Sequence, residues 1–266
     1  MLIKGTKAGE YFHLAQPAHP GAGDQVDAAA GNDTIDGNSG ADTINGGAGN
    51  DRVIGDAGDD RIKLGTGDDG AYGGGGFDTM LGGEGNDTLN GDVGNDLLTG
   101  GKGDDRMYGN SEWQAVTSSL DDDTLHGNSG NDSVYGNSGN DKVYGDIGND
   151  IVDGGAGNDT ISGGKGADTL TGGGGNDQLI WIKSDLATGI VDHVTDLSSG
   201  DVLDLSAIFA HVTGDHATRV AISDSAAGDV LSVKLSATGP FVDVAVLDGH
   251  HDLTIADMLQ YGTLLI

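Results

Sequence analysis

An aspartate recurs at every ninth position of this chain from Asp24 to Asp177, and Gln114 is the one exception. An apolar residue follows two positions after each aspartate, and a glycine usually stands two positions before it. The cleanest copies read GGEGNDTLN (82–90) and GGAGNDTIS (154–162). A phase held this long is not expected of an unfolded linker, so the repeat determines the fold. The apolar column consists of Val26, Ile35, Ile44, Val53, Ile62, Ala71, Met80, Leu89, Leu98, Met107, Val116, Leu125, Val134, Val143, Val152, Ile161, Leu170 and Leu179.

Each nonapeptide predicts a tight turn followed by a short strand. One apolar residue in nine is too few for an amphipathic helix, and each glycine inside a helix costs about 1 kcal/mol. The glycines instead suit a turn that needs positive φ. The three residues after the aspartate suit a strand whose middle side chain points inward. The fold class predicted is therefore all-β: a parallel β-roll with two nonapeptides in each turn and coils stacked about 4.8 Å apart.

The charge of the chain indicates a metal. It holds 43 acidic and 12 basic residues, a net charge of −31, which argues against nucleic acid and bare anionic membrane as partners. Stacked like charges repel by several kcal/mol, and Ca²⁺ relieves this with 6–8 oxygen ligands. Calcium is therefore expected to complete the fold, and the metal-free rod to be largely disordered. In a regular roll one edge would carry Asp33, Asp51, Asp69, Asp87, Asp105, Asp123, Asp141, Asp159 and Asp177, and the other would carry the alternate aspartates from Asp24 to Asp168.

The nonapeptide over 23–180 resembles the GGxGxDxUx repeat of the RTX (repeats-in-toxin) family. The resemblance implies a right-handed roll in which each Ca²⁺ lies between successive turns, on the order of a dozen ions in all. It also implies export of the unfolded chain by a type I secretion system and folding in extracellular calcium. The carboxylate ligands it implies are the sixth-position residues Asp33, Asp42, Asp51, Asp60, Asp69, Asp78, Asp87, Asp96, Asp105, Asp123, Asp132, Asp141, Asp150, Asp159, Asp168 and Asp177. The backbone carbonyl ligands it implies are those of Gly46, Gly82, Gly100, Gly136, Gly154, Gly163 and Gly172.

The stretch 109–122 departs from the pattern. Gln114 replaces the aspartate, and SEWQAVTSSLD (111–121) lacks turn residues. Two alternatives remain: a degenerate turn kept in phase with Val116 inward, or a bulge that loops out of the roll. Both alternatives predict a gap in the calcium sites on the edge that carries Asp96 and Asp132.

The two ends of the chain carry no repeat. Residues 1–22 are expected to cap the first coil, because a solenoid needs its terminal core covered. Neither a signal peptide nor a membrane-spanning run is recognisable. Residues 181–266 regain Leu, Ile and Val, and VLSVKLS (230–236) and FVDVAVLD (241–248) alternate like half-buried strands. We expect a small β-rich capping domain there, with a short helix at 254–260.

This tail resembles the C-terminal target domain of type I-secreted RTX adhesins. The matching residues are DHVTDL (192–197), GDVLDLS (200–206) and MLQYG (258–262). The resemblance implies an uncleaved export signal, a secretion machinery as partner, and an extracellular or cell-surface location. A plain capping role is the alternative. The absence of cysteine suits a chain stapled by metal rather than by disulfides.

No catalytic activity is expected, because the chain holds no HExxH helix, nucleophile elbow or Walker sequence. The function expected is that of a secreted calcium-binding module that folds in extracellular Ca²⁺ and supports export and surface adhesion. One alternative is the tail of an extracellular lipase, protease or sugar epimerase. Another is a glycan-binding module, because aromatic rings at the ninth position can stack on sugars. This hypothesis places Tyr72, Tyr108, His126 and Tyr144 on one sheet and Tyr135 on the other.

Overall fold

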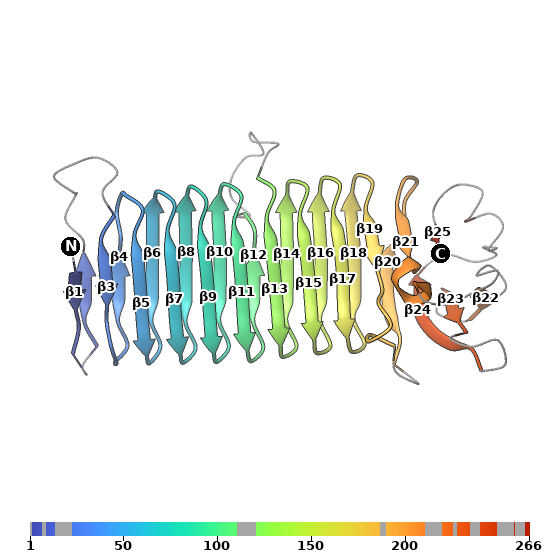
Figure 1. Ribbon diagram of the computed structural model, residues 1–266, viewed down its shortest axis with the longest axis horizontal. Coiled ribbons are helices and arrows are strands. Elements are labelled where there is room, and N and C mark those ends of the chain that lie inside the picture. Colours follow the sequence, from blue (N-terminus) through green and yellow to red (C-terminus); the bar gives the residue numbers. More distant parts are fainter. Residues whose placement is uncertain are drawn as a thin grey trace.

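The computed structural model describes residues 2–6, 9–13, 23–110, 121–186, 190–210, 220–225, 228–234, 240–248, 258 and 264–266. The chain forms a rod of stacked coils that advances from the N-terminal end to the C-terminal end (Figure 1). The described residues are mostly in strands, and helix is limited to the short α1 (Ser206–Phe209) and to Met258. The predicted all-β parallel roll is therefore confirmed.

Two sheets run the length of the rod, and the chain alternates between them. Within the coils every strand pairs in parallel with the strand two places away in the chain, for example Ile44 opposite Ile62. The 12-stranded sheet contains β1 (Leu2–Lys4), β3 (Gln25–Asp27), β5 (Thr43–Ala48), β7 (Arg61–Thr66), β9 (Thr79–Glu84), β11 (Leu97–Lys102), β13 (Thr124–Ser129), β15 (Lys142–Ile147), β17 (Thr160–Lys165), β19 (Gln178–Ile180), β21 (Val202–Asp204) and β25 (Leu264–Leu265). The 13-stranded sheet contains β2 (Tyr11–His13), β4 (Thr34–Asp36), β6 (Arg52–Ala57), β8 (Gly70–Gly75), β10 (Thr88–Val93), β12 (Arg106–Tyr108), β14 (Ser133–Ser138), β16 (Ile151–Ala156), β18 (Thr169–Gly174), β20 (Asp192–Asp196), β24 (Val242–Asp248), β23 (Gly228–Val233) and β22 (Val220–Asp224).

The core is the narrow apolar column between the two sheets. Burial alternates along each strand because successive side chains point to opposite faces, as in β5, where Ile44 is buried between exposed Thr43 and half-buried Asn45. Every described residue of the predicted apolar column is buried. Val116 lies outside the described residues.

One coil is longer than the others. The strands on either side of 111–120 pair directly, β11 with β13 and β12 with β14. Residues stacked across this coil are 27 apart, as in Asp96 and Asp123, whereas other coils of the repeat give 18. The coil that contains 111–120 is therefore nine residues longer than the others, and no further turn of the repeat stacks between β11 and β13 or between β12 and β14. Gln114 itself lies outside the described residues.

Because of this long coil, the aspartates after it lie on the opposite edge from the one expected, and three predictions are wrong as a result. Asp96 stacks directly against Asp123, and Asp105 against Asp132, so the expected gap on the Asp96–Asp132 edge is wrong. One edge in fact carries Asp24, Asp42, Asp60, Asp78, Asp96, Asp123, Asp141, Asp159 and Asp177, and the other carries Asp33, Asp51, Asp69, Asp87, Asp105, Asp132, Asp150 and Asp168. The aromatic residues are also redistributed: Tyr72, Tyr108 and Tyr135 share the 13-stranded sheet, whereas His126 and Tyr144 lie on the other.

Both ends are built onto the two sheets. At the N-terminal end β1 pairs with β3 and β2 pairs with β4, so the first residues add one more coil. At the C-terminal end β20 and β21 continue the sheets in parallel. The boundary expected at 180 therefore does not coincide with the end of the sheets. After β21, β23 pairs antiparallel with both β22 and β24. These three strands form the last open edge of the 13-stranded sheet.

The nine extra residues of the long coil predict a deletion that the roll tolerates. Removing 112–120 leaves GNSDDDTLH, a repeat that restores the eighteen-residue spacing. We expect the free energy of unfolding in calcium to change by less than about 1 kcal/mol, because shortening the connection between two strands changes closure entropy only slightly. Calcium-dependent circular dichroism and urea titration measure this. Loss of the folded signal would show that 111–120 stabilises the roll.

Candidate metal centre

The sixth-position aspartates form two hydrogen-bonded ladders along the edges of the rod. The backbone N–H of each aspartate donates to Oδ1 of the aspartate one coil further on. The N–O distances are 2.8 Å from Asp33 to Asp51 and 2.8 Å from Asp141 to Asp159. Each carboxylate is thereby fixed to the preceding coil by a charge-assisted bond, and its second oxygen, Oδ2, is buried.

The second oxygen, Oδ2, is buried and accepts no hydrogen bond within the described part of the chain. Leaving a buried carboxylate oxygen without a partner is costly. The aspartates concerned are Asp33, Asp42, Asp51, Asp60, Asp69, Asp78, Asp87, Asp96, Asp105, Asp123, Asp132, Asp141, Asp150, Asp159, Asp168 and Asp177. This set is identical to the carboxylate ligands named from the sequence.

Burial raises the pKa of most of these carboxyl groups. It brings the pKa of Asp60, Asp87 and Asp105 to about 7, with a further rise from the neighbouring carboxylates and an opposing effect of the backbone N–H. The pKa of Asp123 rises to about 9, mainly through burial and then through Asp141 and Asp96. Without a cation these groups retain protons near neutral pH. A dication that replaces the protons removes this penalty.

Backbone carbonyls lie beside the orphan oxygens. A Cβ placed on Gly46 would lie 2.5 Å from Asp51 Oδ2 and 2.8 Å from the carbonyl oxygen of Leu64, one coil on. Among the described residues, no three His, Cys, Asp or Glu side chains gather at one point. The donors of each loop are thus one carboxylate together with carbonyls. Oxygen donors of this kind fit Ca²⁺.

The predicted carbonyl ligands all belong to first-position glycines. Five of these carbonyls face the space over the first-position glycine one coil earlier, beside Oδ2 of the aspartate in that loop. They belong to Gly100, Gly136, Gly154, Gly163 and Gly172. Gly46 and Gly82 form such spaces themselves, facing the carbonyls of Leu64 and Gly100. The first position tolerates other residues, since Ala28 and Leu64 occupy it and are buried.

Two further aspartates continue the ladders beyond the region expected from the sequence. Asp192 Oδ1 accepts the N–H of Asp168 at 3.0 Å, and Asp201 Oδ1 accepts that of Asp177 at 3.0 Å. Their Oδ2 atoms are satisfied by protein donors, the indole of Trp181 at 2.6 Å and the N–H of Ser198 at 2.6 Å. The series of Oδ2 atoms without a hydrogen bond therefore ends where Trp181 and Ser198 donate to Oδ2. Asp192 and Asp201 are nine apart and each precedes an apolar residue by two, which is the signal that was missed.

A further kind of ladder, made by the fifth-position residues, was not anticipated from the sequence. The side-chain oxygen of Asn50 accepts the N–H of Asp68, and Asp68 Oδ1 accepts that of Asn86, at 3.2 and 2.9 Å. This ladder lies on the exposed side of the turn and runs in the opposite sense to the sixth-position ladder. Asn and Asp serve equally in it, so its role is to align the turns.

The fourth-position glycines are required by the close stacking of the turns. Gly157 has φ +146° and a Cβ there would meet the carbonyl oxygen of Gly139 in the preceding coil. Gly174, in contrast, has no atom within 4 Å of a Cβ position. We expect Gly157→Ala to destabilise the roll by about 2 kcal/mol or more and to raise the calcium midpoint, and Gly174→Ala to leave both unchanged. Equal effects of the two substitutions in thermal unfolding with calcium would contradict this account.

The comparison with protein families agrees with the geometry. Residues 21–53, 46–80, 81–112, 117–152 and 144–179 match the family described as RTX calcium-binding nonapeptide repeat (4 copies). One solved structure that matches is the solution structure of the AlgE6R3 subunit from the Azotobacter vinelandii mannuronan C5-epimerase, at 31% identity over 58% of this chain and 83% of that chain, with a TM-score of 0.22. No curated protein matches. Among the described residues, no helix has the length and apolar character needed to span a membrane.

The fold and the oxygen-lined turns define a calcium-binding β-roll module. The family match extends over more than half of the chain, and the chain belongs to the RTX calcium-binding nonapeptide repeat family.

Proposed function

We propose that the buried Oδ2 atoms of the two aspartate ladders are the calcium ligands and that the chain is a calcium-gated folding module. The observation that supports this is that the orphan oxygens and the aspartates expected from the sequence are the same set. Bound Ca²⁺ supplies the positive charge that compensates the stacked carboxylates. The ladder bonds hold each carboxylate in place, and the adjacent carbonyls complete the oxygen donors.

The experiment that tests this proposal counts and titrates the ions. We expect on the order of a dozen bound calcium ions per chain, with a midpoint between about 0.1 and 1 mM, the range of extracellular modules. Equilibrium dialysis with atomic emission gives both quantities. Binding of one or two ions only, or saturation at micromolar calcium, would contradict an extracellular switch built from the ladders.

We further propose that the chain is exported unfolded through a type I secretion system and folds outside the cell. The support is the resemblance of 192–206 to a C-terminal target domain and the weak affinity expected for calcium. A reporter fused ahead of 181–266 should appear in the medium of cells that carry such a system. A reporter fused to a tail with 192–206 scrambled is the control. Retention of both fusions inside the cell would refute the export role.

The role outside the cell proposed here is a folded surface or adhesion module without catalysis of its own. The same folding role would serve a tail attached to an extracellular enzyme. The two differ in whether the full protein carries a catalytic domain ahead of this roll.

A further inference from the structure

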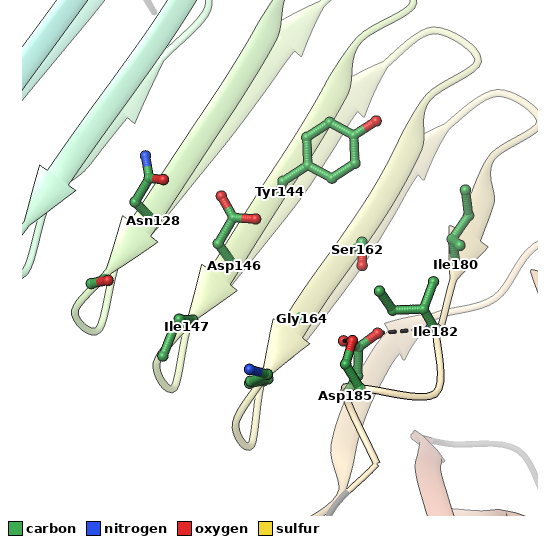
Figure 2. Close-up of a pocket in the computed structure, with 12 residues that line it drawn as sticks. Asn128, Tyr144, Asp146, Ile147, Ser162, Gly164, Ile180, Ile182 and Asp185 are labelled. Carbon is green, nitrogen blue, oxygen red and sulfur yellow. Dashed lines mark hydrogen bonds between the residues drawn. The ribbon is translucent and has the colours of Figure 1, made fainter. Parts of the chain in front are cut away.

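A groove of about 390 Å³ lies on the outer face of the 12-stranded sheet, close to its C-terminal end. One wall comes from β15 with the end of β13 beside it, the floor from β17, and the other wall from the end of β19 and the turn after it. In Figure 2 the walls and floor are marked by Tyr144, Asp146 and Ile147, by Ser162 and Gly164, and by Ile180, Ile182 and Asp185.

The groove exists because short residues lie between tall ones. Tyr144 stands opposite Ser162, and Asp146 opposite Gly164. Since Ile161 pairs with Leu179, the next residue opposite Ser162 is Ile180. The two walls are therefore separated by two strand spacings, about 9.6 Å, and the floor at Ser162 is one spacing from each.

Tyr144 offers one face of its ring to the groove. Its other face stacks on His126, with ring centroids 4.5 Å apart and an interplanar angle of 12°. The two residues lie in register on neighbouring strands, so the stack runs along the axis of the rod. On the groove side, the next side chain in the stack would be Ser162, which is too short to cover the ring.

Carboxylates set the polarity of the groove. Asp146 is held by His126, with 3.1 Å between Oδ2 and Nδ1. Asp185 is held by its own turn, where Oδ2 accepts the N–H of Ile182 at 2.7 Å and Oδ1 accepts the hydroxyl of Ser184 at 3.3 Å. Lys165 is the one cationic lining residue in the described structure, beside these two carboxylates. The groove therefore offers fixed acceptors to hydroxyl groups and repels anions.

We propose that this groove binds a neutral pyranose sugar ring stacked on Tyr144. A ring at the level of Ser162 would lie about 4.8 Å from each wall, which matches the 4.5 Å spacing already adopted by His126 and Tyr144. The C–H face of a sugar suits an aromatic ring on one side and the aliphatic Ile180 and Ile182 on the other. Its hydroxyl groups then reach Asp146 and Asp185. An acidic sugar lacks this complementarity because two carboxylates face it and Lys165 balances only one of them.

The test uses saturation-transfer NMR on the full chain in about 5 mM calcium, a concentration above the midpoint expected for extracellular modules. The probes are the neutral trisaccharides cellotriose, mannotriose and maltotriose, and an oligouronate trisaccharide. Tyr144→Ala removes the stacking face, and Ser162→Tyr fills the groove from an outward-facing strand position. Tyr108→Ala is the matched control, because Tyr108 stacks on Tyr135 on the opposite sheet at 5.2 Å.

The proposal expects transfer to at least one neutral trisaccharide in the native chain and in Tyr108→Ala. It expects affinity at least about tenfold weaker in Tyr144→Ala and no transfer in Ser162→Tyr. Calcium-dependent circular dichroism confirms that each variant folds. Three results would overturn the proposal: no transfer to any neutral probe, transfer that is unchanged by Tyr144→Ala, or preference for the oligouronate.

Discussion

In EDTA, the chain is expected to be unfolded at pH 8 and to gain β-structure as the pH falls to 5. In the folded state the pKa of the ladder aspartates Asp87, Asp141 and Asp159 is raised to about 7. A group whose folded pKa lies above its unfolded value stabilises the fold at low pH, and this contribution is lost as the pH rises through the folded value. This stabilisation is therefore lost between about pH 4 and about pH 7. Protons would substitute for calcium along the ladders.

The opposite dependence is expected when calcium is present. Calcium must displace the protons, so its midpoint should rise about tenfold for each pH unit below 7. Far-UV circular dichroism in EDTA and in calcium measures both effects, and pH 5 keeps the chain above its pI of about 4.1. Metal-free stability that increases with pH would contradict buried, protonated carboxyl groups.

Replacing three consecutive ladder aspartates is expected to remove calcium sites without breaking the ladder. In Asp123→Asn, Asp141→Asn and Asp159→Asn combined, the amide oxygen still accepts the backbone N–H that Oδ1 now accepts. The amide nitrogen replaces Oδ2 and cannot ligate a cation. We expect about three fewer bound ions and a higher calcium midpoint. Metal-free stability at pH 8 should increase, because the variant carries fewer buried carboxylates.

The matched control removes the same charge from the exposed fifth-position ladder. Asp68→Asn, Asp104→Asn and Asp122→Asn place asparagine where Asn50 and Asn86 already serve. Atomic emission after gel filtration gives the bound calcium, and the control should retain the native count. An equal loss in both triple variants would mean that calcium responds to overall charge and not to the Oδ2 atoms.

The repeat predicted most of the fold because each level of the pattern agrees with the others. One apolar residue in nine, turn glycines and a sixth-position aspartate leave few alternatives to stacked coils. The exchange of edges could not be predicted, because the long coil is longer by one nonapeptide, which leaves the nine-residue phase of the sequence intact. Asp105 and Asp123 are eighteen apart in the sequence, yet Asp105 stacks against Asp132.

The C-terminal ends of the ladders were harder to predict, because their spacing departs from the nine-residue pattern. Asp168 and Asp192 stack at a separation of 24 residues, which a search for nines does not detect. The role of Trp181 in closing the ladder depends on a contact with Asp192 that no local pattern encodes. The nine-residue spacing singled out the aspartates whose Oδ2 is buried without a hydrogen bond, and it missed the residues at which this set ends.

The most direct test of calcium-driven folding is a calcium titration of the EDTA-stripped chain at pH 7.5, followed by far-UV circular dichroism, with magnesium as the control. A steep coil-to-β transition with calcium alone is the predicted result, because Mg²⁺ demands a tighter octahedral shell than loops of carboxylates and carbonyls provide. A β-spectrum that persists in EDTA would contradict the account, since the apolar core and caps would then suffice without a cation in the aspartate ladders.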